Sequence, residues 1–353
     1  MEELFTKYIA TRNIKSSTVL VYKRVLVNLH KRINGHLTHK SSGISYHKLF
    51  TELNPNLDWC KDTVAIIELL KPLAPNSQKT FYSILSPLFI FIGKPEIGLI
   101  YKLQIAELGS KLENIKVKQT INKPHLQKAW IPFKTMQERY FKYIETVGNG
   151  GLGISSSCKN NTPFIAVSFM LLFAPRRPSA LEHMKVIIEK PFPKISELST
   201  DYNYLLVTKT GKSSSLIMNN YKTNKHIGQQ IFTDLDPSLA VIIYNFISTR
   251  EKPVGSETDS SPFLLQKTVG NKISNLPYSN AGISMLIKKF MTEELKIPNI
   301  TCTDIRTIYI TDFYNQKVRY IDDINKEAYK LGNSSSEFTK SYVKRASEIN
   351  LLK

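Results

Sequence analysis

Apolar residues spaced three and four positions apart recur along most of the chain, and this spacing limits the fold more than any other feature of the sequence. It places the apolar side chains on one face of an α-helix, where they can pack against a core. One stripe comprises Val19, Tyr22, Leu26, Leu29 and Ile33, and another comprises Phe81, Ile84, Leu85, Leu88 and Ile92. The pattern predicts a chain built mainly from amphipathic helices.

The periodicity fails once over a long stretch, at residues 114–134, which are polar and basic. A chain of 353 residues corresponds to about two domains. We therefore expect an all-helical domain of four or five helices at residues 1–115, a linker at 116–134 and a second domain at 135–353. The first helix of the second domain is predicted to start with a capping box, Thr135-x-x-Glu138.

The second domain combines helices with a few strand-like segments. Residues 163–174 read as a buried helix, and residues 204–208, 214–221 and 229–233 read as strands that form a hairpin or small meander. Further helices are predicted at 238–249, 279–295, 304–315, 322–331 and 336–348. The fold class expected from these elements is mainly α, with a small antiparallel β-sheet in the second domain.

The chain carries 48 basic and 29 acidic residues, a net charge of +19, and both predicted domains are basic. Such a charge favours a polyanionic partner, nucleic acid before an acidic membrane surface. The longest apolar run, 164–175, is too short to span a bilayer, and the N-terminus lacks the apolar core of a signal peptide. We therefore expect no membrane partner and a location inside the cell on DNA, in a nucleus, nucleoid or viral factory, rather than secretion.

Several kinds of site are excluded by spacing. The three cysteines are far apart and form no CxxC pair, so neither a disulfide scaffold nor a cysteine-rich zinc module is expected. The histidines form no HExxH motif, and no GxSxG motif occurs. The glycine-rich segment 148–153 lacks the Lys-Ser/Thr ending of a nucleotide-binding loop. The candidates that remain are cationic residues and a tyrosine near the C-terminus.

These candidates follow a recognisable order. The arginine pair Arg176 and Arg177 follows the buried helix, Lys222 lies between two predicted strands, and a helix opens with Thr303-Asp-Ile-Arg306. A Leu-Gly-Asn-Ser turn contains Asn333, and Tyr342 lies nine residues beyond it. This order and spacing resemble the tyrosine recombinase (phage integrase) family, and segments 15–29 and 76–88 resemble helix openings of its core-binding domain.

The resemblance implies a two-domain, C-shaped clamp on double-stranded DNA. It implies a site-specific recombinase or integrase of a mobile element or virus, which cleaves and rejoins DNA through a 3′-phosphotyrosine intermediate without metal, ATP or another cofactor. It also implies a homo-oligomer, a tetramer on two DNA sites, with an accessory protein that bends DNA.

The resemblance assigns the roles as follows. Tyr342 is the nucleophile, Lys222 the general acid, and Arg177 and Arg306 bind the non-bridging phosphate oxygens. Guanidinium groups suit that position because their forked donors match the geometry of a phosphate. Thr303 stands at a position where the family has histidine. Asn333 stands where the family has histidine or tryptophan. Both can donate a hydrogen bond to a phosphate, but neither can act as an imidazole base, which predicts a slower or partner-assisted catalyst.

Each assignment has an alternative. Arg176 competes with Arg177, and Lys225 competes with Lys222. The alternative for Arg306 is a structural salt bridge, for Thr303 a helix N-cap, and for Asn333 a left-handed turn beside Gly332. Tyr342 lies on an apolar stripe and could be a core residue, while His226 could bring an imidazole to the site; the competing tyrosines are Tyr320 and Tyr329.

Two other functions fit the same residues. One is a DNA-binding protein of this fold that has lost catalysis, which Thr303 and Asn333 favour. The other is a nicking and closing enzyme similar to topoisomerase IB, with the same tyrosine chemistry in a monomer. An RNA-binding module has little support because no RNP-like aromatic motif is present.

Overall fold

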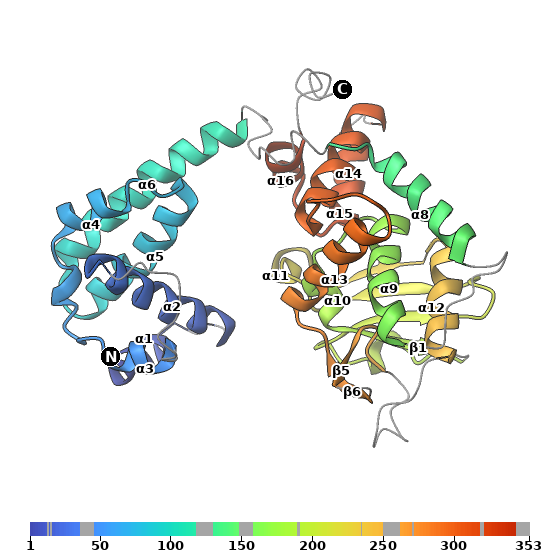
Figure 1. The fold of residues 1–353 in the computed structure, drawn as a ribbon, viewed down its shortest axis with the longest axis horizontal. Helices are drawn as coiled ribbons and strands as arrows, with labels where there is room; N and C mark the ends of the chain where they lie inside the picture. Colours follow the sequence, from blue (N-terminus) through green and yellow to red (C-terminus); the bar gives the residue numbers. More distant parts are fainter. Residues whose placement is uncertain are drawn as a thin grey trace. The chain divides into compact units, whose positions relative to one another are not determined.

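The computed structural model describes residues 1–12, 14, 16–35, 46–117, 130–147, 158–188, 191–233, 235–249, 262–269, 272–317 and 321–343. The chain forms two compact units, Met1–Lys118 and Gln119–Lys353, which are described separately below (Figure 1). The predicted boundaries at residues 115 and 134 stay predictions, because residues 118–129 lie outside the described part. The expected clamp shape likewise stays a prediction.

The smaller unit is entirely helical over its described residues. Its helices are α1 (Glu2–Ala10), α2 (Ser16–Ile33), α3 (Tyr46–Thr51), α4 (Thr63–Leu70), α5 (Pro75–Phe91) and α6 (Pro95–Val117), with a short 3-10 helix at Asp58–Cys60. The apolar stripes predicted α2 and α5 closely. Helices α1 and α3 are additional to the expected elements, because α1 and α3 are too short to show a full stripe.

Local signals in the sequence explain where these helices begin and end. The Asp62 carboxylate accepts a hydrogen bond from the Ala65 amide at 3.0 Å and caps α4. Pro75 opens α5, where its missing N–H is not needed. Gly93, with φ +78°, ends α5 in the left-handed conformation. The unit has its own core, in which the rings of Tyr82 and Tyr101 stack at 5.7 Å.

In the larger unit, helices pack against a small sheet (Figure 1). Its helices are α8 (Phe133–Val147), α9 (Cys158–Leu172), α10 (Pro178–Glu182), α11 (Asn224–Ile227), α12 (Pro237–Thr249), α13 (Asn280–Glu293), α14 (Cys302–Lys317), α15 (Ile321–Lys330) and α16 (Ser335–Glu337). Its strands are β1 (Met184–Ile188), β2 (Asn203–Val207), β3 (Ser215–Met218), β4 (Gln230–Phe232), β5 (Gln266–Val269) and β6 (Lys272–Pro277).

The main sheet is mixed, so the expectation of a purely antiparallel sheet was wrong. Its strand order is β1-β2-β3-β4, and β2, β3 and β4 form the expected antiparallel meander. Strand β1 pairs with β2 in parallel, because the segment from Ile188 to Asn203 is long enough to cross back before β2 begins. Strands β5 and β6 form a separate hairpin that was not predicted.

Helix α9 forms the centre of this unit. Its residues Ile165–Leu171 are buried all round, as the apolar run predicted, and α8, α12 and α13 pack against it. The one polar side chain in this run is satisfied, because Ser168 Oγ donates to the Phe164 carbonyl and accepts from Tyr140 Oη at 2.6 Å.

Helix α8 begins at Phe133, two residues before the predicted start, so Thr135 lies inside the helix. The predicted capping box was therefore wrong. Another element supplies the cap: Asp312 of α14 accepts a hydrogen bond from the Phe133 amide at 2.6 Å. The start of α8 could not be predicted from its local sequence, because the capping residue lies 179 positions away.

The C-terminal elements form a satellite apolar cluster with Ala174. The helix predicted at 336–348 is instead the short α16 followed by a π-helical stretch, Phe338–Tyr342, after which Val343 is extended. Ser334 caps α16 by accepting from the Glu337 amide at 3.2 Å. Residues 344–353 lie outside the described part.

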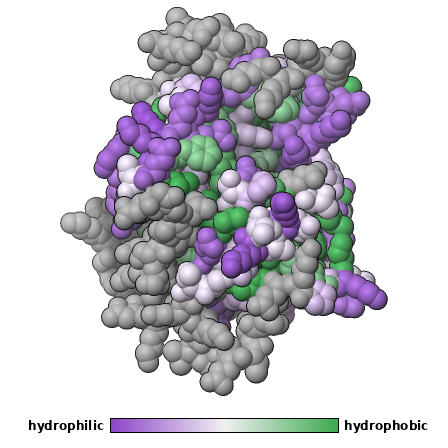
Figure 2. All heavy atoms as spheres, turned by 90° about the vertical axis from the view of Figure 1, so that its right-hand side faces the viewer, coloured by the Kyte–Doolittle hydropathy of each residue, from purple (hydrophilic) through white to green (hydrophobic). Residues whose placement is uncertain are grey.

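The face of the molecule in Figure 2 is largely hydrophilic, with hydrophobic residues in small separate areas among the described ones. Over the described residues, no helix combines the length and the apolar character that crossing a membrane requires.

Candidate active site

One pocket of about 530 Å³ in the larger unit gathers most of the predicted site residues. Its walls come from the start of α10, the turn after β3, one face of α13, the beginning of α14 and the end of the π-helical stretch. It is lined by Arg177, Pro178, Ser179, Lys222, Asn280, Ser284, Met285, Lys288, Thr301, Cys302, Thr303, Arg306 and Tyr342. Five of the six predicted residues are therefore in one place, and the sixth, Asn333, contacts Arg306.

Tyr342 has its ring in the core and its hydroxyl at the pocket. The residue is 8% exposed, its ring belongs to the C-terminal apolar cluster, and its carbonyl accepts from Thr311 Oγ1 at 2.9 Å. The hydroxyl accepts a long hydrogen bond of 3.5 Å from Arg177 Nη2. The Arg306 guanidinium lies 5.5 Å from the ring centroid. Tyr342 is thus a core residue at its ring and a pocket residue at its hydroxyl, so both interpretations of its sequence apply.

Arg306 is 2% exposed, and backbone and amide groups, rather than a carboxylate, hold it. Its Nη1 donates to the Pro175 carbonyl, and its Nη2 donates to Asn333 Oδ1 at 3.4 Å, while Nε has no partner among the described residues. Neither Arg306 nor Arg177 forms an ion pair within the described part of the chain. The structural salt bridge considered for Arg306 is therefore wrong.

These two cations change the acidity of the tyrosine. Burial raises the pKa of Tyr342, but the charges of Arg306 and Arg177 and their hydrogen bonds outweigh burial, so the pKa is lowered from its ordinary value. Tyr309 shows the contrast, because burial and the neighbouring Glu327 raise its pKa. Burial also lowers the pKa of Arg306, yet a guanidinium stays protonated in proteins.

Lysines complete the positive charge of the pocket. Lys222 is exposed and lies in the turn between β3 and α11, whereas Lys225 and the exposed His226 belong to α11 and do not line the pocket. Lys288 of α13 is a second lining lysine, which was not predicted because nothing in its local sequence distinguishes it. No aspartate, glutamate or histidine lines the pocket among the described residues.

Thr303 lies in the first turn of α14 and is exposed to the pocket, so the alternative role of helix N-cap was wrong. Thr301 takes that role. Its Oγ1 accepts from the Asp304 amide at 3.3 Å, and the Asp304 carboxylate accepts from the Thr301 amide at 3.0 Å and from its hydroxyl at 2.6 Å. The Thr303 hydroxyl is consequently not used by the helix cap.

Asn333 is 5% exposed and is not a left-handed residue, so that alternative was wrong. Gly332 takes the left-handed conformation with φ +64°. The Asn333 amide donates to the Ala328 carbonyl and the Gly332 amide to the Tyr329 carbonyl, both at 2.9 Å, which ends α15 in a Schellman motif. The motif directs the Asn333 side chain toward Arg306, and Asn333 Nδ2 is buried without a partner among the described residues.

The competing residues lie elsewhere. Arg176 does not line the pocket and is buried, with Nη1 donating to Gln230 Oε1 at 2.8 Å. Tyr329 is 40% exposed on α15 and does not line the pocket. Tyr320 lies outside the described residues, as does the glycine-rich segment 148–153.

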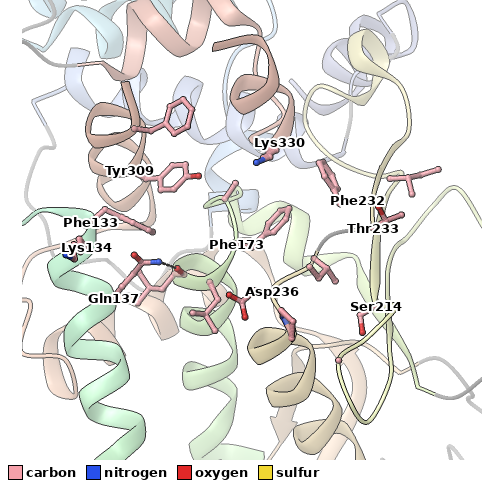
Figure 3. Close-up of a pocket in the computed structure, with 18 of the residues that line it drawn as sticks. Phe133, Lys134, Gln137, Phe173, Ser214, Phe232, Thr233, Asp236, Tyr309 and Lys330 are labelled. Atoms are coloured by element: carbon pink, nitrogen blue, oxygen red, sulfur yellow. Dashed lines mark hydrogen bonds between the residues drawn. The ribbon is translucent and has the colours of Figure 1, made fainter. Parts of the chain in front are cut away.

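A larger pocket of about 1060 Å³ lies elsewhere in the same unit and contains none of the predicted site residues (Figure 3). Aromatic side chains from several elements line it, among them Phe133, Phe173, Phe232 and Tyr309. Its two carboxylates accept hydrogen bonds from backbone amides, Asp312 from Phe133 and Asp236 from Ser238. We assign it no chemistry.

The described residues contain no cluster of histidine, cysteine, aspartate and glutamate that could hold a metal ion. The donor set of the smaller pocket is guanidinium, ammonium, hydroxyl and amide groups, with the N-termini of α13 and α14 beside them. Such donors bind anions, and phosphate in particular.

No protein-family model matches the chain, and no curated protein matches it in sequence. Among solved structures, the chain is similar to the crystal structure of XerA recombinase, with a TM-score of 0.38 and 12% sequence identity, over 99% of this chain and 95% of that chain. The function is therefore inferred from the pocket's own residues.

Proposed function

We propose that the protein is a tyrosine-type DNA strand transferase, a site-specific recombinase or integrase that acts on double-stranded DNA. One observation carries the proposal: the Tyr342 hydroxyl lies 3.5 Å from Arg177 in a pocket with Arg306 and Lys222, and no carboxylate there neutralises these cations among the described residues. Arg306 is buried without an ion pair among the described residues, and a buried, unpaired cation is expensive in the free protein and favours an anionic ligand. A phosphodiester supplies the missing charge and also the electrophile for tyrosine.

In the proposed reaction, Tyr342 Oη attacks the phosphorus, a new Oη–P bond forms, and the bond from phosphorus to the 5′-oxygen breaks. The pentacoordinate transition state carries extra negative charge on the non-bridging oxygens. Arg177 and Arg306 donate to these oxygens, and each such donor contributes about 10²–10³ in rate. Thr303 and Asn333 have hydroxyl and amide donors that support the same charge.

Two proton movements accompany the step. An ordinary tyrosine with a pKa of about 10 is ionised in roughly one molecule in a thousand at pH 7, so the lowered pKa of Tyr342 increases the reactive fraction. Its proton leaves to solvent, because no histidine among the described residues lines the pocket. Lys222 gives a proton to the departing 5′-oxygen.

The 3′-phosphotyrosine keeps the energy of the broken ester bond, so attack by a 5′-hydroxyl rejoins DNA without a nucleotide cofactor. Attack by the 5′-hydroxyl of a different strand exchanges strands. We propose that the helical smaller unit provides the second DNA-binding surface, and that exchange takes place in a homo-tetramer on two DNA sites with the help of a DNA-bending protein. A mobile element or virus is the expected context, and the expected location is on DNA within the cell.

A second candidate is a DNA-binding protein that has lost catalysis. The absence of any imidazole among the described lining residues favours it, because Thr303 and Asn333 can bind a phosphate but cannot act as an imidazole base. A nicking and closing enzyme is chemically the same as the first candidate and differs in acting as a monomer.

The test is a covalent-trapping assay with nicked suicide duplexes drawn from the flanks of the gene. The wild-type protein should form a denaturant-stable adduct with DNA, and Tyr342→Phe should form none. Tyr329→Phe is the matched control, since this tyrosine lies in the same unit but outside the pocket. No adduct from the wild type, together with salt-sensitive DNA binding, would favour the non-catalytic candidate.

A further inference from the structure

Arg176 is a second fully buried arginine, and its guanidinium lies over two aromatic rings. It is 1% exposed, and its guanidinium carbon lies 5.1 Å from the ring centroid of Phe232 and 5.6 Å from that of Tyr221. Cation–π contacts of this kind hold the plane of the guanidinium in one orientation. Burial and the nearby Arg306 lower the pKa of Arg176 to about 9, so it is still charged at neutral pH.

Packing alone does not account for an arginine at this position. Its Nε and Nη2 are buried without a partner, and it forms no ion pair among the described residues. Replacing a buried, unpaired charge by an apolar side chain of similar volume is often neutral or stabilising. Because Arg176 does not line the pocket, direct phosphate binding does not account for it either.

Its hydrogen bonds lead to the turn that ends α15. Arg176 Nη1 donates to Gln230 Oε1 at 2.8 Å, and Gln230 Nε2 donates to the Tyr329 carbonyl at 2.6 Å. The same carbonyl accepts from the Gly332 amide at 2.9 Å and so belongs to the Schellman motif. Gln230 thus connects the guanidinium to the backbone of the turn.

The turn also packs directly on Arg176. A Cβ atom at Gly332 would lie 3.0 Å from Arg176 Nη1 and 3.3 Å from the Tyr221 ring. On its other side, the Gly332 carbonyl accepts from Thr223 Oγ1 at 2.6 Å. Arg176, Gln230 and Thr223 therefore hold the turn from several directions.

The next residue in the chain belongs to the candidate active site. Asn333 Oδ1 accepts from Arg306 Nη2 at 3.4 Å, and Arg306 lies against Tyr342. We propose that Arg176 is a positioning residue, which acts through Gln230 and the Leu331–Asn333 turn to align Asn333 and Arg306 with Tyr342. The proposal rests on the proposed function, because the alignment matters for attack by Tyr342 on DNA. The effect of Arg176 on the ionisation of Tyr342 can be tested without DNA cleavage.

The first test compares rates of adduct formation in a single turnover at saturating DNA. Arg176→Leu should slow this step about 10²-fold, as expected when a catalytic group is displaced by about 1 Å, with DNA affinity unchanged. Gln230→Glu keeps an acceptor for Arg176 but removes the donor to the Tyr329 carbonyl, so it should slow the same step. The double variant should be no slower than the slower single variant.

The matched control is Arg139→Leu. Arg139 is an exposed arginine of the larger unit that donates to the Leu295 and Lys296 carbonyls at 3.3 and 2.9 Å and is not linked to the turn. This variant should keep the wild-type rate. If it slows the reaction as much as Arg176→Leu does, the loss reflects general destabilisation and the proposal is overturned.

The second test is a spectrophotometric titration of Tyr342, obtained as the difference between each protein and its Tyr342→Phe counterpart. Arg176→Leu and Gln230→Glu should both move the ionisation of Tyr342 to higher pH, because Arg306 is no longer held against it. Unchanged rate and unchanged titration in folded Gln230→Glu would overturn the proposal even if Arg176→Leu does not fold. If the wild type forms no adduct but the two variants still shift the ionisation of Tyr342, the result would refute the proposed function and leave the positioning role of Arg176 in place.

Discussion

At the level of single residues, the acidity of the Tyr342 hydroxyl depends on the neighbouring guanidinium groups. The ring packs in an apolar cluster, which fixes the position of the hydroxyl, while two unneutralised guanidinium groups lie at the polar end. Low-dielectric surroundings strengthen this electrostatic effect on the hydroxyl. Burial by itself raises the pKa of Tyr342, so its reactivity depends on the two guanidinium groups, whose charges outweigh that effect.

A pH dependence follows from the lowered pKa of Tyr342. Above its pKa the hydroxyl is ionised, so the rising limb of the rate–pH profile should lie at lower pH than the ordinary tyrosine pKa of about 10 implies. Arg177→Met removes one stabilising cation and should move that limb to higher pH. Rates of adduct formation across pH would check this, and an identical limb in both proteins would show that Arg177 does not act on Tyr342.

Arg306 provides a prediction in which activity and stability separate. Arg306→Met should reduce adduct formation by about 10²–10³ or more, because a donor to the phosphate is lost. The free protein should unfold at an unchanged or higher temperature, because a buried, unpaired charge is removed. Calorimetry beside the trapping assay measures both, and a large drop in unfolding temperature would mean that Arg306 is structural.

Among the helices and strands, those with a periodic apolar pattern were predictable. Features that depend on contacts between residues distant in the sequence were not. The stripes of α2 and α5 and the meander of β2 to β4 follow from local patterns. Strand β1 was missed because its short run, Met184–Ile188, directly follows a helix and shows no alternation. The start of α8 depends on Asp312, and Lys288 reaches the pocket only through the packing of α13, so neither left a local signal.

Two helices that end in the same motif give a matched prediction. Gly93 after α5 and Gly332 after α15 both have positive φ, but a Cβ at Gly93 would meet nothing within 4 Å, whereas one at Gly332 would meet Arg176. Gly93→Ala should destabilise the protein by about 1 kcal/mol, the cost of the left-handed conformation. Gly332→Ala should cost more and should also slow adduct formation. Denaturant unfolding measures the difference, and equal losses would show that the turn has room beside Arg176.

At the scale of the whole molecule, the net charge of +19 sets the expected response to salt. A DNA-binding protein with six to ten phosphate contacts loses about 10³–10⁵ in affinity between 50 and 200 mM salt. We expect a slope in this range for the intact chain. Binding titrations at several salt concentrations would check it, and a flat response would contradict binding to the phosphate backbone.

Tyr342 should carry DNA covalently, and mass spectrometry can map the residue that bears the adduct. Trapped complexes would be digested with nuclease and protease, and the peptide that bears the remaining nucleotide would be sequenced. We expect a nucleotide joined through its 3′-phosphate to Tyr342. A nucleotide on another residue, or one joined through a 5′-phosphate, would contradict it.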